Sequence, residues 1–117
     1  MSDIVTTYLD TWNATDEATR ADLLQRHWSP DCLYVDPMAR ATGREQVGAT
    51  VGAVHQQFPG FVFSQVGEAD THAEQTRFRW GLGPAGEEPV VIGFDVLVTD
   101  GDDTIREVRG FLDQVPA

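Results

Sequence analysis

Hydrophobic residues recur at helical spacing in the first half of the chain and alternate as in β-strands in the second half. Three helical segments come first, each bounded by capping or breaking residues. Four strand-like runs follow, separated by turn-forming residues, at positions 61–66, 73–82, 90–98 and 105–112. Helices gathered on one face of an antiparallel meander define the α+β class. We therefore expect three N-terminal helices packed on a curved, mainly antiparallel sheet, as one domain over residues 1–117.

The first predicted helix covers residues 3–13 and carries one apolar stripe, formed by Val5, Tyr8, Leu9 and Trp12. Because Tyr8 lies within this stripe, we expect its ring to be buried. Its hydroxyl group then needs a partner in the interior, which is either a backbone carbonyl or a group of a functional site.

The other two helices are predicted from their end signals as well as from their apolar residues. The second follows Thr15, which suits an N-cap, and is expected to end at Ser29-Pro30. The third begins with a capping-box pattern over Thr42–Glu45, and Pro59-Gly60 ends it.

A short strand is predicted at Cys32–Val35, directly before Asp36-Pro37. Side chains alternate along a strand, so Tyr34 and Asp36 should face the same side. Proline keeps the residue before it extended, which fixes the direction of the Asp36 carboxylate. Two interpretations stay open: Asp36 only begins a turn, or it is a functional carboxylate. Residues 38–41 are expected to form a short connection.

Asp95 interrupts the most strongly β-forming run of the chain, in which both faces are apolar. The residues on its own face carry no charge: Val91, Gly93 and Leu97. A buried carboxylate either pairs with a cation or takes up a proton, because desolvation raises its pKa. Arg77 or Arg79 on a neighbouring strand is one candidate partner. The alternative is a protonated Asp95 that points to the helix-covered side, near Tyr8.

Charge and composition exclude several classes of function. The formal net charge is −11 at pH 7, whereas nucleic acids and anionic membranes need a basic face. Cys32 is the only cysteine, so neither a disulfide nor a cysteine zinc site is expected. The three histidines lack partners at metal-site spacing: His27, His55 and His72. Without a signal-peptide pattern or a membrane-length apolar run, we expect a soluble, cytoplasmic protein.

Over nearly its whole length the chain resembles the nuclear-transport-factor-2-like (NTF2-like) superfamily, which includes ketosteroid isomerases and SnoaL-like polyketide cyclases. Ketosteroid isomerases carry a tyrosine in the first helix before a short acidic loop, which Tyr8 matches. Their general base is the aspartate of a strand-ending Asp-Pro, which Asp36 matches, followed by a helix start like Gly43-Arg44-Glu45-Gln46. Their second oxyanion donor is a protonated aspartate in an apolar strand, which Asp95 matches.

The resemblance implies an enzyme that needs no metal or redox cofactor. Asp36 would move a proton next to a carbonyl group, while Tyr8 and protonated Asp95 stabilise the enolate oxygen. The expected ligand is an apolar or aromatic ketone, and Gly93 would leave room for it beside Asp95. We expect the pocket wall to include four further residues: Trp12, Trp28, Val51 and Leu112. Trp28 and Val51 stand where the family carries tyrosines, and Leu112 stands where it carries another aromatic residue.

Alternatives stay open because strand-ending Asp-Pro is widespread in this superfamily. One is a SnoaL-like polyketide cyclase or hydratase with the same base. Another is a non-catalytic dimer that binds a small molecule. A limonene-epoxide-hydrolase reaction is disfavoured, since the Arg-x-Asp strand motif of those enzymes is replaced here by Arg77-Phe78-Arg79. Both faces of residues 90–98 are apolar and helices can cover only one, so we expect a homodimer through the outer face of the sheet.

Overall fold

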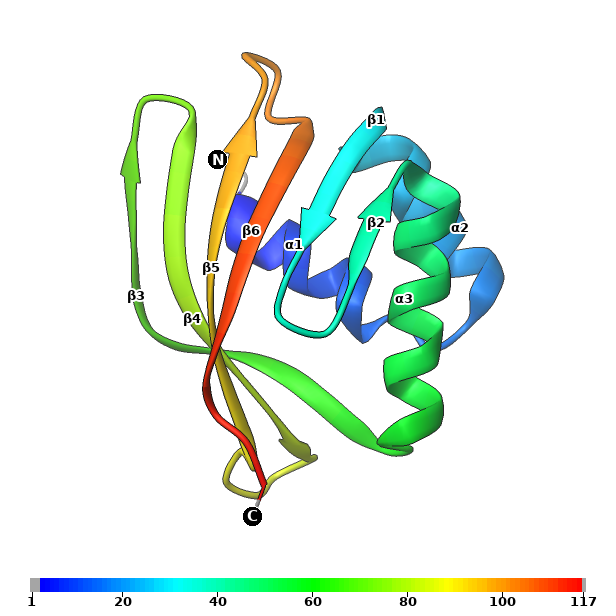
Figure 1. Cartoon of the computed structure of the whole chain (residues 1–117), viewed down its shortest axis with the longest axis vertical. Helices are drawn as coiled ribbons and strands as arrows, with labels where there is room; N and C mark the ends of the chain where they lie inside the picture. Colours follow the sequence, from blue (N-terminus) through cyan, green and yellow to red (C-terminus); the bar gives the residue numbers. More distant parts are fainter. Residues whose placement is uncertain (1–2, 117) are drawn as a thin grey trace.

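Three helices lie on one face of a six-stranded sheet in the computed structural model, which describes residues 3–116 (Figure 1). The elements in chain order are α1 (Ile4–Asn13), α2 (Glu17–His27), β1 (Trp28–Val35), β2 (Arg40–Thr42), α3 (Arg44–Gln57), β3 (Phe61–His72), β4 (Gln75–Pro84), β5 (Val91–Thr99) and β6 (Ile105–Gln114). The predicted α+β fold is confirmed. Within the described residues, no helix is long and apolar enough to cross a membrane.

The strands are ordered β2-β1-β6-β5-β4-β3 across the sheet. The four long strands β3 to β6 pair consecutively and antiparallel, as the meander pattern predicts. β1 and β6 form the one parallel pair among residues 3–116, with Tyr34 opposite Val108. This pairing places the end of β1, and with it Asp36, beside β6 and one strand away from β5.

The core lies between the helices and the covered face of the sheet, and alternation along the strands decides which side chains enter it. The inward-facing large side chains of β4 and β5 are buried, among them Phe78, Trp80, Leu82, Val91 and Leu97. From the opposite side, α1 buries the whole predicted stripe of Val5, Tyr8, Leu9 and Trp12. Figure 1 shows α1 lying across the sheet, while α2 and α3 lie together beside β1 and β2.

The first strand begins four residues earlier than predicted, at Trp28. Ser29-Pro30 therefore lies inside β1, and α2 already ends at His27. Proline cannot donate a ladder hydrogen bond and is tolerated at irregular positions of a sheet. Here the β1–β6 register shifts between Trp28 and Leu33, which lets the proline occupy an internal strand.

Two helix starts also differ from the prediction. Asp16, not Thr15, caps α2, because its Oδ2 accepts a hydrogen bond from the backbone N–H of Thr19 at 2.9 Å. The capping box predicted over Thr42–Glu45 is wrong. Thr42 belongs to the short strand β2, part of which was expected to be a connection, and Gly43, with a φ of 84°, is the N-cap residue directly before α3. Glycine adopts this positive φ without steric cost, and it has no side chain that could cap the helix.

Candidate functional site

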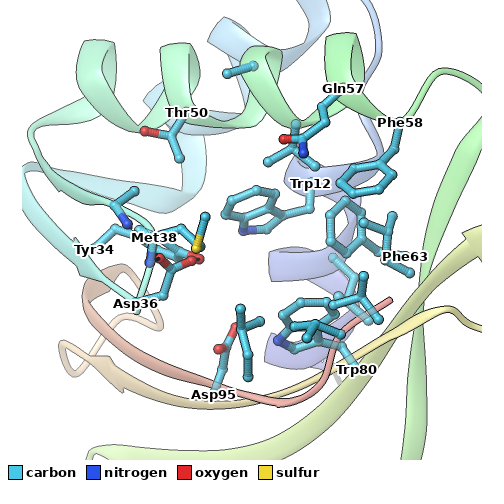
Figure 2. Close-up of a pocket in the computed structure, with 18 of the residues that line it drawn as sticks. Trp12, Tyr34, Asp36, Met38, Thr50, Gln57, Phe58, Phe63, Trp80 and Asp95 are labelled. Carbon is cyan, nitrogen blue, oxygen red and sulfur yellow. Dashed lines mark hydrogen bonds between the residues drawn. The ribbon is translucent and has the colours of Figure 1, made fainter. Parts of the chain in front are cut away.

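A cavity of about 570 Å³ lies between α1, α3 and the covered face of the sheet (Figure 2). Most of its wall is aromatic or aliphatic, with contributions from Leu9, Trp12, Phe58, Phe63, Trp80 and Leu82. In Figure 2 the carboxylates of Asp36 and Asp95 lie at one end, and Thr50 and Gln57 project from α3 at the other. An apolar cavity of this size with a few converging polar groups is typical of a small-molecule site.

The Asp36 carboxylate is held by three hydrogen bonds at the end of β1. Its Oδ1 accepts the backbone N–H groups of Met38 and Ala39, both at 2.8 Å, and its Oδ2 accepts the hydroxyl proton of Tyr34 at 2.5 Å. Asp36 thus begins the turn, as one interpretation predicts, and also lines the cavity. A carboxylate has about four acceptor positions, so one position on Oδ2 remains for a ligand.

Tyr8 and Asp95 are joined by a buried hydrogen bond across the core. The Tyr8 hydroxyl donates to Oδ2 of Asp95 at 2.7 Å, and each residue is only 2% exposed. The expectation that Asp95 points to the helix-covered side near Tyr8 is therefore correct. The partner of the Tyr8 hydroxyl is a carboxylate and not a backbone carbonyl.

The alternative that an arginine neutralises Asp95 is wrong. Arg77 lies 3.5 Å from Asp70 and Arg79 lies 3.6 Å from Asp113, and all four side chains are well exposed. Alternation along β4 directs these arginines to the outer face, whereas Asp95 points inward.

Burial raises the pKa of Asp95 to about 6, against hydrogen bonds from Tyr8 and Trp80, while the nearby Asp36 adds to the rise. Burial, followed by the charge of Asp95, also raises the pKa of Tyr8 well above its ordinary value of 10. Tyr8 therefore remains a proton donor at any physiological pH. With this pKa, Asp95 keeps its proton to a higher pH than an ordinary aspartate does, which is the direction that the resemblance implies.

Gly110 on β6 brings the two carboxylates close together. It pairs with Asp95 across the β5–β6 ladder. A Cβ atom at this position would lie 2.5 Å from Oδ1 of Asp95 and 3.3 Å from Cβ of Asp36. The missing side chain thus leaves room for the Asp95 carboxylate against β6, with the Cβ atom of Asp36 close by.

The four predicted wall residues divide into two pairs. Trp12 and Leu112 line the cavity, as expected. Trp28 and Val51 do not, because both are completely buried outside it. Trp28 instead stacks on the Tyr8 ring with a centroid distance of 5.7 Å, on the far side from the cavity. The hydrophobicity of these residues predicted that they are buried, but not whether they line the cavity or pack in the core behind its wall.

The space expected beside Gly93 is also filled. The indole ring of Trp80 lies directly against this glycine, so closely that an added Cβ would collide with it. Gly93 therefore makes room for a wall residue of the cavity and not for the ligand. In Figure 2 the nitrogen of this ring is turned toward Asp95.

Tyr34 is a site residue whose role the sequence reasoning missed. It is 3% exposed, lines the cavity and donates to Asp36. The available signal was its position two residues before Asp36, which puts both side chains on the same face of β1. Burial and then the charges of Asp95 and Asp36 raise the pKa of Tyr34 well above 10, so its hydroxyl stays protonated.

The donor set does not suit a metal ion. Within residues 3–116, no three His, Cys, Asp or Glu side chains are grouped as a metal site requires. Asp36 and Asp95 provide the only side-chain carboxyl groups among the residues that line the cavity, and no arginine or histidine lines it with them.

No protein-family model and no curated protein matches this sequence. A solved structure from Agrobacterium tumefaciens, named as a candidate isomerase of the SnoaL-like family, is 36% identical. The match covers 94% of each chain with a TM-score of 0.89. The chain belongs to the SnoaL-like family.

More distant structures share the fold of this SnoaL-like protein. A candidate polyketide cyclase from Sinorhizobium meliloti is 19% identical over 94% of each chain, with a TM-score of 0.72. A candidate ketosteroid isomerase from Kribbella flavida is 18% identical over 97% of this chain and 78% of its own, with a TM-score of 0.70. At these identities the likeness supports the NTF2-like fold alone.

Proposed function

We propose that this SnoaL-like protein is a cofactor-independent enzyme that transfers a proton on a neutral, apolar ketone. The observation that carries the proposal is that Asp36, Tyr8 and Asp95 meet at one end of an apolar cavity. A general base needs hydrogen-bond reach to the proton that it removes, and an enolate needs donors at its oxygen. Both requirements can be met at this end.

In the proposed step, Asp36 accepts a proton from the carbon next to the ketone. The C–H bond breaks, an O–H bond forms on Oδ2 of Asp36, and the electron pair moves to the carbonyl oxygen to give an enolate. Protonated Asp95 donates to this oxygen while its Oδ2 accepts from Tyr8, so the two donors act in series. Asp36 then returns the proton to the same carbon or to a conjugated one, which completes an exchange or an isomerisation.

The charge of the cavity supports a neutral substrate. Two acids and no base line it, so a ligand with its own carboxylate or phosphate would meet repulsion with no cation to offset it. The aromatic wall favours a flat or ring-shaped carbon skeleton. An aromatic-fused cyclic ketone such as 2-tetralone has these properties and is a suitable probe.

Cyclisation of a polyketide is the second candidate, supported by structures of the same fold that are named as candidate polyketide cyclases. The same enolate would then attack a second carbonyl carbon in the ligand, forming a C–C bond in place of the returned C–H bond. The two reactions share Asp36 as base and differ in their product.

Hydrogen–deuterium exchange tests the common step without knowledge of the natural substrate. When 2-tetralone is incubated with the protein in D₂O, the hydrogens next to the carbonyl group should exchange for deuterium. NMR measures the rate of this exchange. Asp36→Asn should reduce the rate at least 100-fold, the order of general-base effects, while Asp113→Asn, outside the cavity, should not. Binding of 2-tetralone without enhanced exchange would overturn the enzyme proposal in favour of a binding protein.

A further inference from the structure

Two carboxyl groups lie close together at one end of the cavity. Oδ1 of Asp95 and Cβ of Asp36 are both within 3.3 Å of one point, the place where a Cβ at position 110 would be. Figure 2 shows both carboxyl groups at the same end of the cavity. Charged groups inside a protein are normally paired with an opposite charge, so this pair of acids calls for a cation.

The protein does not supply that cation from its own side chains. All eight basic residues of the chain are arginines, and within residues 3–116 none of them lines the cavity. Next to Gly110 on β6, Arg109 pairs with Glu107 at 2.9 Å, and its side chain is about half exposed. Arg20 and Arg44 donate to backbone carbonyl groups at the ends of α1 and α2. A positive charge at the two acids would therefore come from a bound molecule.

The acceptor positions that remain suit a donor with several N–H groups. Oδ2 of Asp36 keeps one position beside its hydrogen bond from Tyr34, and the Tyr8 hydroxyl occupies Oδ2 of Asp95 rather than Oδ1. An ammonium group carries three N–H donors on one atom, so it can bond to both carboxyl groups at once. Aromatic rings attract cations as well as apolar skeletons, so the aromatic wall suits the rest of such a ligand.

We propose that the cavity binds an apolar primary amine in its ammonium form, with the nitrogen between Asp36 and Asp95. The inference goes beyond the proposed function, because it rests on the charge and lining of the cavity and applies equally to an enzyme or a binding protein. The ammonium group takes the place of the carbonyl end of a ketone, so the amine inhibits the proposed proton transfer by competition. The net charge of −11 also favours the approach of cations.

The affinity for the amine should rise as the pH increases from 5 to 7.5. Burial raises the pKa of Asp95 to about 6, and only its ionised form attracts an ammonium group, which itself stays protonated over this range. Tyr8 and Tyr34 keep their protons, since the pKa of each lies well above 10. Asp36 is the remaining titratable group on the described wall, and the wall residues of α3, β3, β4 and β6 carry no charge.

Calorimetry with a matched pair of probes tests the inference. 2-Aminotetralin and 2-tetralol share one ring skeleton and differ only in an ammonium or a hydroxyl group. At pH 7.5 the wild-type protein should bind the amine at least about 10-fold more tightly than the alcohol, the effect of one hydrogen bond to a charged group. The amine should displace the alcohol, and its advantage should shrink at pH 5. Equal affinities for the two probes at pH 7.5 would overturn the inference.

Two conservative variants assign the effect to the carboxyl groups. Asp36→Asn and Asp95→Asn should each weaken amine binding by about 10-fold and change alcohol binding little. Asp95→Asn should also lose the rise of affinity with pH. Asp113→Asn removes one negative charge outside the cavity and should bind the amine as the wild-type protein does. A preference for the amine that survives in both carboxyl variants would arise elsewhere on the acidic surface and would contradict the inference.

Deuterium exchange into 2-tetralone, measured without the amine, separates this inference from the proposed function. If the amine binds at the two acids but the wild-type protein exchanges no protons, the enzyme proposal fails and the amine site stands. If exchange occurs but the amine binds no more tightly than the alcohol, the amine site fails and the enzyme proposal stands.

Discussion

The Asp95 carboxylate occupies the space that a side chain at Gly110 would need. The two residues face each other across the β5–β6 ladder, and Oδ1 of Asp95 would lie 2.5 Å from a Cβ at position 110. That separation is shorter than any normal contact between these atoms. The site therefore depends on a residue that has no functional group.

Gly110→Ala is expected to displace Asp95 and to weaken both folding and ligand binding. Crowding of a packed interior by one methyl group costs about 1–3 kcal/mol. Urea unfolding should show this loss, and binding of 2-naphthol, a phenol that mimics an enolate, should fall with it. Gly101→Ala is the matched control, since nothing lies within 4 Å of the added carbon there. Equal stabilities of the two variants would contradict the crowding argument.

The stability of Asp95→Asn relative to wild type should grow as the pH rises from 4 to 7. The pKa of Asp95 is about 6 in the folded protein and 3.8 as a reference for the unfolded chain. The folded state thus binds the proton more tightly, and wild type loses stability as pH rises between these values. The difference can reach about 3 kcal/mol at pH 7, from 1.36 kcal/mol for each pH unit.

Thermal or urea unfolding at several pH values measures this effect. Asp113→Asn on the outer edge should show no such growth, because its side chain is about half exposed. A pH-independent difference between wild type and Asp95→Asn would mean that Asp95 ionises normally.

Proton transfer by the wild-type protein should decline above about pH 6. In the proposed step, protonated Asp95 would donate to the enolate oxygen and ionised Asp95 would repel it, and burial raises the pKa of this group to about 6. Asparagine keeps a donor that does not titrate, so Asp95→Asn should retain much of the activity and lose the decline. The pH profile of deuterium exchange into 2-tetralone is the measurement. A decline that persists in the variant would have to come from another group.

Tyr34→Phe should slow proton transfer about 10- to 100-fold and leave ligand affinity nearly unchanged. The substitution removes only the hydroxyl that holds Oδ2 of Asp36, and hydrogen bonds to charged groups contribute about 1.5–3 kcal/mol. The carboxylate would keep its two backbone donors, but Oδ2 would no longer be held in one orientation toward the substrate. Separate measurement of exchange rate and 2-naphthol affinity tests this division. A parallel loss of affinity would show that Tyr34 only shapes the cavity.

We propose that the outer face of the sheet joins two copies of the chain. Phe111 is 60% exposed and pairs with the half-buried Phe94 in the β5–β6 ladder. The arginines on this face are already neutralised, for example Arg79 by Asp113, so the strongly acidic chain would not repel itself here. Sedimentation should give a dimer at micromolar concentration and a monomer for Phe111→Ser. Met38→Ser, 80% exposed at the cavity, is the control that should remain dimeric.

Alternation and charge made much of the site predictable from sequence. The burial of Asp95 follows from the apolar residues around it in the strand, and the shared direction of Asp36 and Tyr34 follows from their spacing. Local patterns carry no information about the depth of a buried residue. Trp28 and Val51 were expected on the cavity wall because they stand where the related family carries tyrosines, but both are completely buried and do not line the cavity.

Features that depend on register were out of reach of sequence reasoning. The accommodation of Pro30 needs the irregular β1–β6 pairing, and the role of Gly110 needs the ladder that sets it opposite Asp95. Gly93 was expected to leave space for a ligand. Its partner on β4 is Trp80, whose ring fills that space, and the direction of this ring could not be read from the sequence. The resemblance identified Tyr8, Asp36 and Asp95, which lie together at the cavity, but not Tyr34, which donates to Asp36.

The parallel pairing of β1 with β6 has a consequence for the order of folding. β1, which directly precedes the proposed base Asp36, finds its long partner only in the last strand of the described chain, so the loop to be closed spans most of the molecule. Such distant pairings form late, because the entropy of closing the loop is lost before the contacts form. The hairpins of β3 to β6 can assemble earlier from neighbouring segments. In a chain that is still emerging from the ribosome, Asp36 and Asp95 would therefore lie apart. The two carboxyl groups would come together at the cavity only when β6 pairs with β1.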